Sequence, residues 1–296
     1  MGARRPRTGD RRRNGRTEEG PRRIAGRRDA RRAAGIAGYP VARRRAVRHI
    51  ARDGSQPHRP LRPPHRRPIS AAHLERLLRR AKLAGGARVL DLGCGQAPWI
   101  LRALELYPEA TADGVDISGD GLAAAAEDAD RRGLSDRLRL HEAKAADFTA
   151  AEPYDLVLCV GATHAFGGLT ETLRAVRRHL RPAGLALVGE GFWERPPGQE
   201  VLDGLGAAPD EYADLAGTVA RAEGAGYAVV HAHTSTLAEW DEYEWSWTGT
   251  LTRWALDHPG PDGDAALATA REHRDLWLGG YRGVLGFVTF LLRDLR

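Results

Sequence analysis

The residues with the clearest chemical potential lie in the stretch from Ala87 to Pro98, ARVLDLGCGQAP. Gly93 and Gly95 carry no Cβ, so they allow a sharp turn and a close approach of the backbone to a ligand. Pro98 suits the first turn of a helix, and a helix N-terminus presents free N–H groups to a ligand. Together these features predict a cofactor site of the nucleotide type at the end of a short apolar strand.

The charge of Asp91 narrows the class of cofactor. From Gly93 the turn reads G-x-G-x-x-P, which lacks the third glycine of the dinucleotide fingerprint. A carboxylate two residues before Gly93 would repel a pyrophosphate, whereas it would attract an ammonium group. We therefore expect a cofactor with a positively charged end.

The segment VLDLGCG resembles the first motif of class I S-adenosylmethionine-dependent methyltransferases, whose pattern is acidic-x-Gly-x-Gly-x-Gly. The chain departs from that pattern at its last position, where it has Ala97. Three further segments follow strand-like runs in the order that the family has: Asp116, then Ala146 to Phe148, then Gly161 to His164. The resemblance implies a methyltransferase enzyme with S-adenosylmethionine as its cofactor.

The resemblance also implies roles for individual residues. Asp116 lies where an acidic side chain can accept hydrogen bonds from both ribose hydroxyls. Asp147 would accept a hydrogen bond from the exocyclic amine of adenine, and Phe148 would pack against the adenine ring. The cofactor-binding residues that we expect are Asp91, Gly93, Cys94, Gly95, Asp116, Ile117, Ala146, Asp147, Phe148 and Val160.

Strands and helices alternate from about residue 87 to residue 190, which predicts a parallel sheet with right-handed crossovers. The resemblance implies an α/β fold with a Rossmann-like, doubly wound sheet of seven strands, the last of them antiparallel. Ser70 is a candidate N-cap for a helix before the sheet. A mainly helical insertion at about 234–280 precedes the last strand, and we expect it to cap the cofactor end of the sheet.

The basic residues are concentrated at the N-terminal end of the chain. Residues 1–68 hold 22 Arg, no Lys and 5 acidic residues, whereas the rest of the chain has an excess of acidic residues. Because so few apolar groups occur there, we expect residues 1–68 to be a disordered tail and residues 69–296 to form the methyltransferase domain. A basic tail could bind nucleic acid or an anionic surface, and it could equally fold back weakly on its own domain.

Two residues after the central strands are candidates for catalysis. His164 follows the fourth strand, where ligands collect in such sheets, and its imidazole can take a proton near neutral pH. Glu190 follows the fifth strand at the same edge. Each has an alternative interpretation, a backbone-bonded loop histidine for His164 and an ion pair for Glu190.

Aromatic residues are densest between Leu237 and His258. A helix over this stretch would align Trp240, Tyr243, Trp247, Leu251 and Trp254 in one stripe, which predicts a face packed on a core. Trp245 falls on the opposite face, where a ligand, a second helix or a partner chain would have to cover it. The residues that we expect at the substrate are Trp193, Tyr243, Trp245 and Tyr281, although Trp193 could instead be a packed loop aromatic.

No metal site is expected from the sequence. His231 and His233 share one face of the predicted sixth strand, but no third ligand occurs at a suitable spacing. The two cysteines, Cys94 and Cys159, suggest neither a disulfide framework nor a metal site, and they fit a reducing cytoplasm. The longest apolar run, GVLGFVTFLL, is too short to span a membrane.

Three functions are compatible with these features. A methyltransferase for a small-molecule acceptor ranks first, because the aromatic insertion could enclose a compact substrate. An RNA or DNA methyltransferase that uses the basic tail ranks second, because Gly161 to His164 does not resemble the acidic-or-Asn-Pro-Pro-aromatic motif of base methylation. A non-catalytic cofactor-binding protein ranks third. The sequence leaves the acceptor atom and the oligomeric state open.

Overall fold

The structure is a computed structural model that describes residues 67–296. Residues 1–66, which include most of the predicted tail, lie outside the described residues. At the start of the described residues, next to the predicted domain boundary at Ile69, the Nε of Arg67 donates a hydrogen bond to the carbonyl of Val160 at 3.2 Å. Ile69 is buried in the core.

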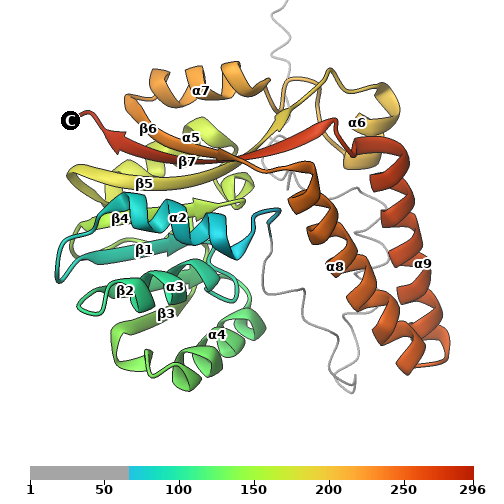
Figure 1. Ribbon diagram of the computed structural model, residues 1–296, viewed down its shortest axis with the longest axis horizontal. Helices are drawn as coiled ribbons and strands as arrows, with labels where there is room; N and C mark the ends of the chain where they lie inside the picture. The colour runs from blue at the N-terminus through green and yellow to red at the C-terminus, as the bar shows by residue number, and fades with distance from the viewer. Residues whose placement is uncertain (1–66) are drawn as a thin grey trace, which may run out of the picture. The chain divides into compact units, whose positions relative to one another are not determined.

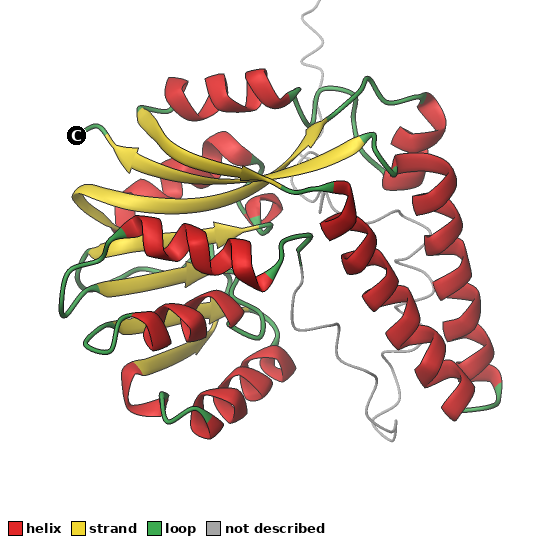
Figure 2. Ribbon diagram, viewed as in Figure 1, coloured by secondary structure: helices red, strands yellow, loops and turns green. Residues whose placement is uncertain are grey.

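A seven-stranded sheet forms the centre of the described domain, with the strand order β3-β2-β1-β4-β5-β7-β6. β1 to β5 are parallel, and β7 runs antiparallel between β5 and β6, so the predicted fold class is confirmed. The parallel strands point toward the side on which the C-terminal helices lie (Figure 2). The strands are β1 (Arg88–Leu92), β2 (Thr111–Asp116), β3 (Leu138–Glu142), β4 (Tyr154–Val160), β5 (Leu180–Trp193), β6 (Tyr227–Thr234) and β7 (Leu285–Asp294).

Helices cover both faces of this sheet (Figure 1). The α-helices are α2 (Ala71–Ala81), α3 (Pro98–Leu106), α4 (Gly119–Arg131), α5 (Leu169–His179), α6 (Gln199–Leu205), α7 (Leu215–Gly224), α8 (Leu237–Asp257) and α9 (Pro261–Leu276). Shorter turns are η1 (Ser135–Arg137), η2 (Thr163–Ala165) and the π-helical η3 (Trp277–Tyr281). One hydrophobic core joins the sheet to α2, α3 and α4, and a second joins it to α5 and α7. None of the helices within residues 67–296 combines the length and apolarity of a membrane span.

Local sequence explains where α2 begins and which face it buries. The Ser70 hydroxyl accepts a hydrogen bond from the backbone N–H of His73, as the predicted N-cap should. Leu74, Leu77 and Leu78 recur at helical spacing and are buried against the sheet. The helix therefore lies along the edge of the predicted cofactor turn, where its first residues can border a ligand.

The insertion between β6 and β7 is a helical hairpin of α8 and α9, which run antiparallel beyond the ends of the strands (Figure 1). The predicted core stripe on α8 is met only in part: Trp240 packs against the hydrophobic core, and all five residues (Trp240, Tyr243, Trp247, Leu251 and Trp254) are half-buried. The buried residues of α8, which are Glu244, Thr248 and Ala255, each directly follow a residue of that stripe. α8 packs on α9 rather than flat on the sheet, and small residues of α9 (Gly263, Ala266 and Ala270) allow the close approach.

Candidate active site

The glycine turn after β1 has the geometry of a ligand-binding loop. Gly93 has a φ of +84°, and its N–H donates to the carbonyl of Val115 at 2.8 Å. A Cβ on Gly93 would lie 2.4 Å from the Cβ of Ala162, so only glycine fits there. Ala97, where the motif lacks its third glycine, has a φ of 57° and is buried as the N-cap of α3. Ala97 thus adopts the left-handed backbone conformation that glycine adopts more readily.

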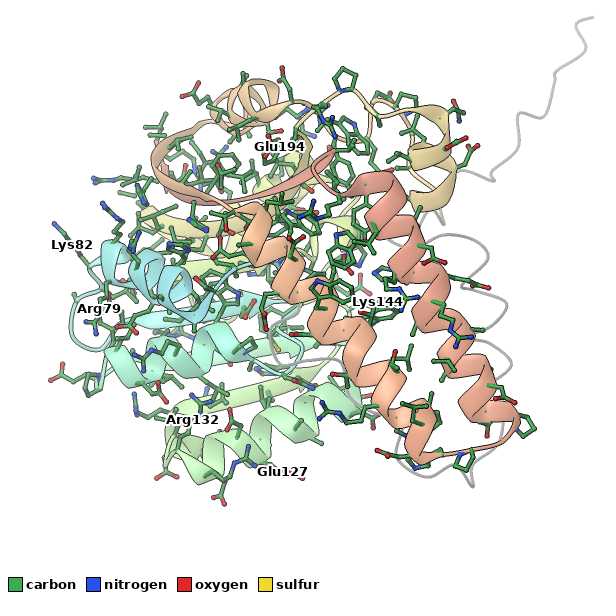
Figure 3. All side chains as sticks on the ribbon, turned by 45° about the vertical axis from the view of Figure 1, so that its right-hand side comes forward. Arg79, Lys82, Glu127, Arg132, Lys144 and Glu194 are labelled. Atoms are coloured by element: carbon green, nitrogen blue, oxygen red, sulfur yellow. The ribbon has the colours of Figure 1, made fainter. Side chains whose placement is uncertain are left out.

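A cavity of about 560 Å³ opens at this turn, beside the carboxyl ends of β1, β2 and β4. Its volume is in the range of small-ligand sites. Seven of the ten predicted cofactor-binding residues line it: Asp91, Gly93, Cys94, Asp116, Ile117, Ala146 and Val160. Lys144 also lines it, on the side of the domain opposite to Arg79 and Lys82 at the far end of α2 (Figure 3).

Asp91 is a buried carboxyl group in the wall of this cavity, with only 2% of its surface exposed. Burial raises its pKa to about 8, and the nearby Asp116 carboxylate adds to the rise, whereas Arg67 opposes it. A cationic group bound in the cavity would favour the ionised form of Asp91. The site is therefore suited to a ligand that brings its own positive charge.

The carboxylate of Asp116 is fixed by two backbone amides. One oxygen accepts from the N–H of Gly95 at 2.7 Å, and the other accepts from the N–H of Ser118 at 2.9 Å. Each carboxylate oxygen has more than one acceptor position, so both can still bind a hydroxyl. Gly95 does not line the cavity, and its part in the site is this contact with Asp116.

The adenine contacts expected after β3 are only partly met. Ala146 and Ile117 both line the cavity, and Ile117 is an apolar side chain that is 71% exposed. Phe148 does not line the cavity, which corrects the prediction. Its ring lies 5.1 Å from that of His141 and 5.9 Å from that of His179, because it packs against the core under α5. Asp147 is exposed outside the cavity.

Of the two candidate catalytic residues, one lines the cavity and the other does not. His164, on η2, lines the cavity, and burial together with the charge of Arg67 lowers its pKa, so the imidazole is neutral at neutral pH. Glu190 lies behind it on β5, outside the cavity, where it accepts from the hydroxyl of Thr163 at 3.2 Å and from the N–H of Gly191 at 2.9 Å. Burial raises the pKa of Glu190 to about 7.

Known proteins with a similar sequence and fold place this geometry in a family. A family of methyltransferase domains matches residues 89–184. YjhP of Escherichia coli, an uncharacterized protein, is 31% identical over 193 residues, which cover 64% of this chain and 76% of YjhP. The crystal structure of YjhP aligns with a TM-score of 0.71 over 77% of this chain and 94% of that chain, at 27% identity.

Two similar structures contain a ligand. S-adenosylmethionine-dependent methyltransferases from Thiobacillus denitrificans and Geobacter sulfurreducens, each in complex with S-adenosyl-L-homocysteine, align with a TM-score of 0.72 at 27% identity. The alignments cover 77% and 86% of this chain, and 93% and 98% of those chains. The chain is a class I S-adenosylmethionine-dependent methyltransferase. The predicted family, enzyme class and cofactor are thereby confirmed.

The four residues of the methyltransferase that were predicted to contact the substrate lie in different environments. Tyr243 lines a second cavity of about 390 Å³, which shares Arg67 and Ile69 with the first. Trp245 is 51% exposed, packs edge-on against Trp277 and lines an open groove that shares Leu74 and Pro98 with the first cavity. The contact of Trp245 with the substrate therefore stays a prediction.

The other two predicted substrate residues are buried in the protein. Trp193 packs edge-on against Tyr212, and its Nε1–H donates to the carbonyl of Pro209 at 3.3 Å. Tyr281 donates its hydroxyl proton to the buried carboxylate of Glu244. Neither residue lines the two cavities described above, because both are held by partners at the base of the helical hairpin.

Sequence reasoning missed Arg67, which lines both cavities of the methyltransferase. It also missed Glu244 and His273, whose side chains form a hydrogen-bonded group with Tyr281 inside the hairpin. Glu244 did not stand out in the sequence, because the same helix also carries Glu239, Asp241 and Glu242. Arg67 had no local signal, because it resembles the other arginines of the predicted tail.

The pKa of Asp91 predicts a pH-dependent affinity for S-adenosylhomocysteine. We expect the ammonium of the ligand to pair with the ionised carboxylate of Asp91, whereas burial favours the protonated form of Asp91 in the free protein below about pH 8. Binding therefore releases a proton, and we expect the affinity to rise by up to about tenfold per pH unit between pH 6 and 7.5. Calorimetry of wild type and Asp91→Asn checks this, because the amide cannot ionise. An equal slope in both proteins would contradict the assignment.

Proposed function

We propose that this methyltransferase transfers the methyl group of S-adenosylmethionine to a small-molecule acceptor bound in the 390 Å³ cavity beside the cofactor. The single observation that carries the proposal is that this cavity shares Arg67 and Ile69 with the 560 Å³ cavity. Its other wall comes from the first turns of α8, including Glu242 and Tyr243. A compartment of this size suits a compact molecule rather than a nucleic acid strand.

The cofactor contacts belong to the same proposal. The ammonium group of S-adenosylmethionine pairs with Asp91, and the ribose hydroxyls donate to Asp116. The adenine ring packs against Ile117 and Ala146, which line the cavity. Gly93, Cys94 and Val160 complete the contact surface, and Gly95 contributes through its bond to Asp116. These roles are supported by the burial of Asp91 and by the backbone bonds that hold Asp116 in place.

His164 is the proposed general base. The acceptor atom attacks the methyl carbon as the bond from that carbon to sulfur breaks, and the bonding electrons go to sulfur to give S-adenosylhomocysteine. The acceptor then carries a surplus proton, which the neutral imidazole of His164 takes up. Glu190 is a positioning residue, since it holds Thr163 next to His164 without facing the cavity.

A labelling assay tests the acceptor class. We expect methyl label from S-adenosylmethionine to enter a small-molecule fraction of a bacterial extract. RNA, DNA and protein fractions serve as parallel acceptors. Label that enters only RNA or DNA, and that is lost when residues 1–66 are deleted, would overturn the proposal in favour of a nucleic-acid methyltransferase.

Substitution of His164 tests the proposed base with the acceptor so found. His164→Gln should lower kcat by roughly 100-fold or more, since general-base catalysis contributes 10²–10⁴-fold. The affinity for S-adenosylhomocysteine should change little. His141→Gln is the matched control, because His141 bonds Asp113 outside the cavity. An unchanged kcat in His164→Gln would exclude this residue as the base.

A further inference from the structure

Three side chains with metal-binding chemistry meet where α2, β6 and the start of α8 come together. His73 Nδ1 lies 2.7 Å from one carboxylate oxygen of Glu239, and His233 Nε2 lies 2.9 Å from the other. One ligand atom from each of the three residues lies within 4.8 Å of the others. The two imidazole rings are 4.0 Å apart between centroids. The sequence indicated no third ligand for His231 and His233, because no suitable residue lies near them along the chain. The fold instead brings His73 and Glu239 next to His233.

We propose that His73, His233 and Glu239 bind one divalent transition-metal ion of the zinc type. Two imidazole nitrogens and one carboxylate oxygen form a common zinc ligand set, which leaves a fourth position for water. Hard cations such as Mg²⁺ prefer sites made of oxygen ligands, so this donor set selects against them. The ligands come from distant parts of the chain, and a bound ion would link three elements of the fold.

The carboxylate of Glu239 is held in place without any metal. Its two oxygens accept from the backbone N–H groups of Ser70 at 2.7 Å and Thr236 at 3.0 Å. Glu239 also completes the capping box that begins α8. Such outer contacts orient metal ligands and raise affinity, because the ligand loses little freedom when the ion binds.

Both histidines can present a lone pair to the ion. A neutral imidazole carries one proton, and transfer of that proton to the other ring nitrogen frees His73 Nδ1 or His233 Nε2 for coordination. The three side chains are partly buried, with exposed fractions of 27% for His73, 14% for His233 and 10% for Glu239. An ion can therefore enter from solvent while most of its surroundings are protein.

A metal ion bound to this cluster would stabilise the attachment of the helical hairpin to the rest of the domain. Glu239 lines the 390 Å³ cavity, and its ion would bind the first turn of α8 to α2 and β6. The hairpin would then be anchored beside that cavity by coordination in addition to hydrogen bonds. This inference does not depend on the identity of the methyl acceptor.

Calorimetric titration of the full-length, chelator-treated protein with Zn²⁺ tests the site. We expect one equivalent to bind, with Co²⁺ giving the absorption spectrum of a nitrogen- and oxygen-ligated ion, while Mg²⁺ does not bind. His73→Ala, His233→Ala and Glu239→Gln should each weaken Zn²⁺ binding by more than about tenfold, since even outer contacts contribute 10–100-fold. His231→Ala is the matched control, because it lies two residues from His233 in the same strand and outside the cluster.

Control measurements distinguish a variant that has lost the metal site from a variant that has failed to fold. Each variant should keep its circular dichroism spectrum and its binding of S-adenosylhomocysteine. Zn²⁺ affinity that is equal in His231→Ala, His73→Ala and His233→Ala would overturn the proposal, as would the absence of stoichiometric binding to the wild type.

Discussion

Replacing Glu244 with alanine is expected to lower the free energy of unfolding by about 3 kcal/mol. Glu244 is only 2% exposed, and its carboxylate accepts from the hydroxyl of Tyr281 and contacts Nε2 of His273. The substitution removes the acceptor that both groups share, while their mutual contact at 3.2 Å can remain. Because they join α8, α9 and η3, the loss should loosen the whole base of the hairpin.

Urea denaturation measures this effect. The matched control is Glu242→Ala, since Glu242 is exposed on the same helix and its side chain contacts the hydroxyl of Ser246. Surface changes of that kind usually stay within about 0.5 kcal/mol. If both variants unfold at the same urea concentration as the wild type, the buried group does not hold the hairpin together.

Replacing Gly93 with alanine should abolish measurable binding of S-adenosylhomocysteine and lower the stability by roughly 2–4 kcal/mol. The left-handed φ of +84° disfavours any side chain, and the new Cβ would collide with Ala162 across the turn. Relief of that contact moves the turn or η2, and both border the cofactor cavity.

Thermal denaturation with and without ligand reports both effects. In the wild type, S-adenosylhomocysteine at 100 times its dissociation constant adds about 2.7 kcal/mol of stability. Gly224→Ala is the control, because Gly224 lies at the end of α7 with no heavy atom near its missing Cβ. Ligand stabilisation of Gly93→Ala equal to that of the control would show that the turn tolerates a side chain.

The sheet and its cofactor edge could be predicted because their signals are local. Val89 and Leu90 form a short apolar strand, and the glycines after it mark the turn. Asp116 could be placed because parallel strands end at one edge, so a residue that follows a strand is brought to the ligand. The same rule failed for Phe148, since it fixes the position of the backbone and leaves the direction of the ring to packing under α5.

The helical hairpin was harder to predict because its packing partner is another part of the insertion. The aromatic periodicity of α8 predicted a face packed on the core of the sheet domain. In the structure α8 packs on α9, and its buried residues, such as Glu244, each lie one position after a residue of the aromatic stripe. His73 and Glu239 are 166 positions apart, so no spacing rule could bring them together with His233. Contacts of this kind follow from the tertiary fold alone.

The insertion leaves and re-enters the sheet through neighbouring strands that are already paired. Thr234 at the end of β6 lies opposite Val288 of β7, and the N–H of Ser235 bonds the carbonyl of Phe287 at 2.8 Å. β6 and β7 are hydrogen-bonded to each other up to the ends of the insertion. The length or sequence of the insertion can therefore change without a shift in the register of these strands. An exchange of the hairpin between related chains would leave the pairing of β6 with β7 intact, and such chimeras are a direct way to assay what the hairpin contributes.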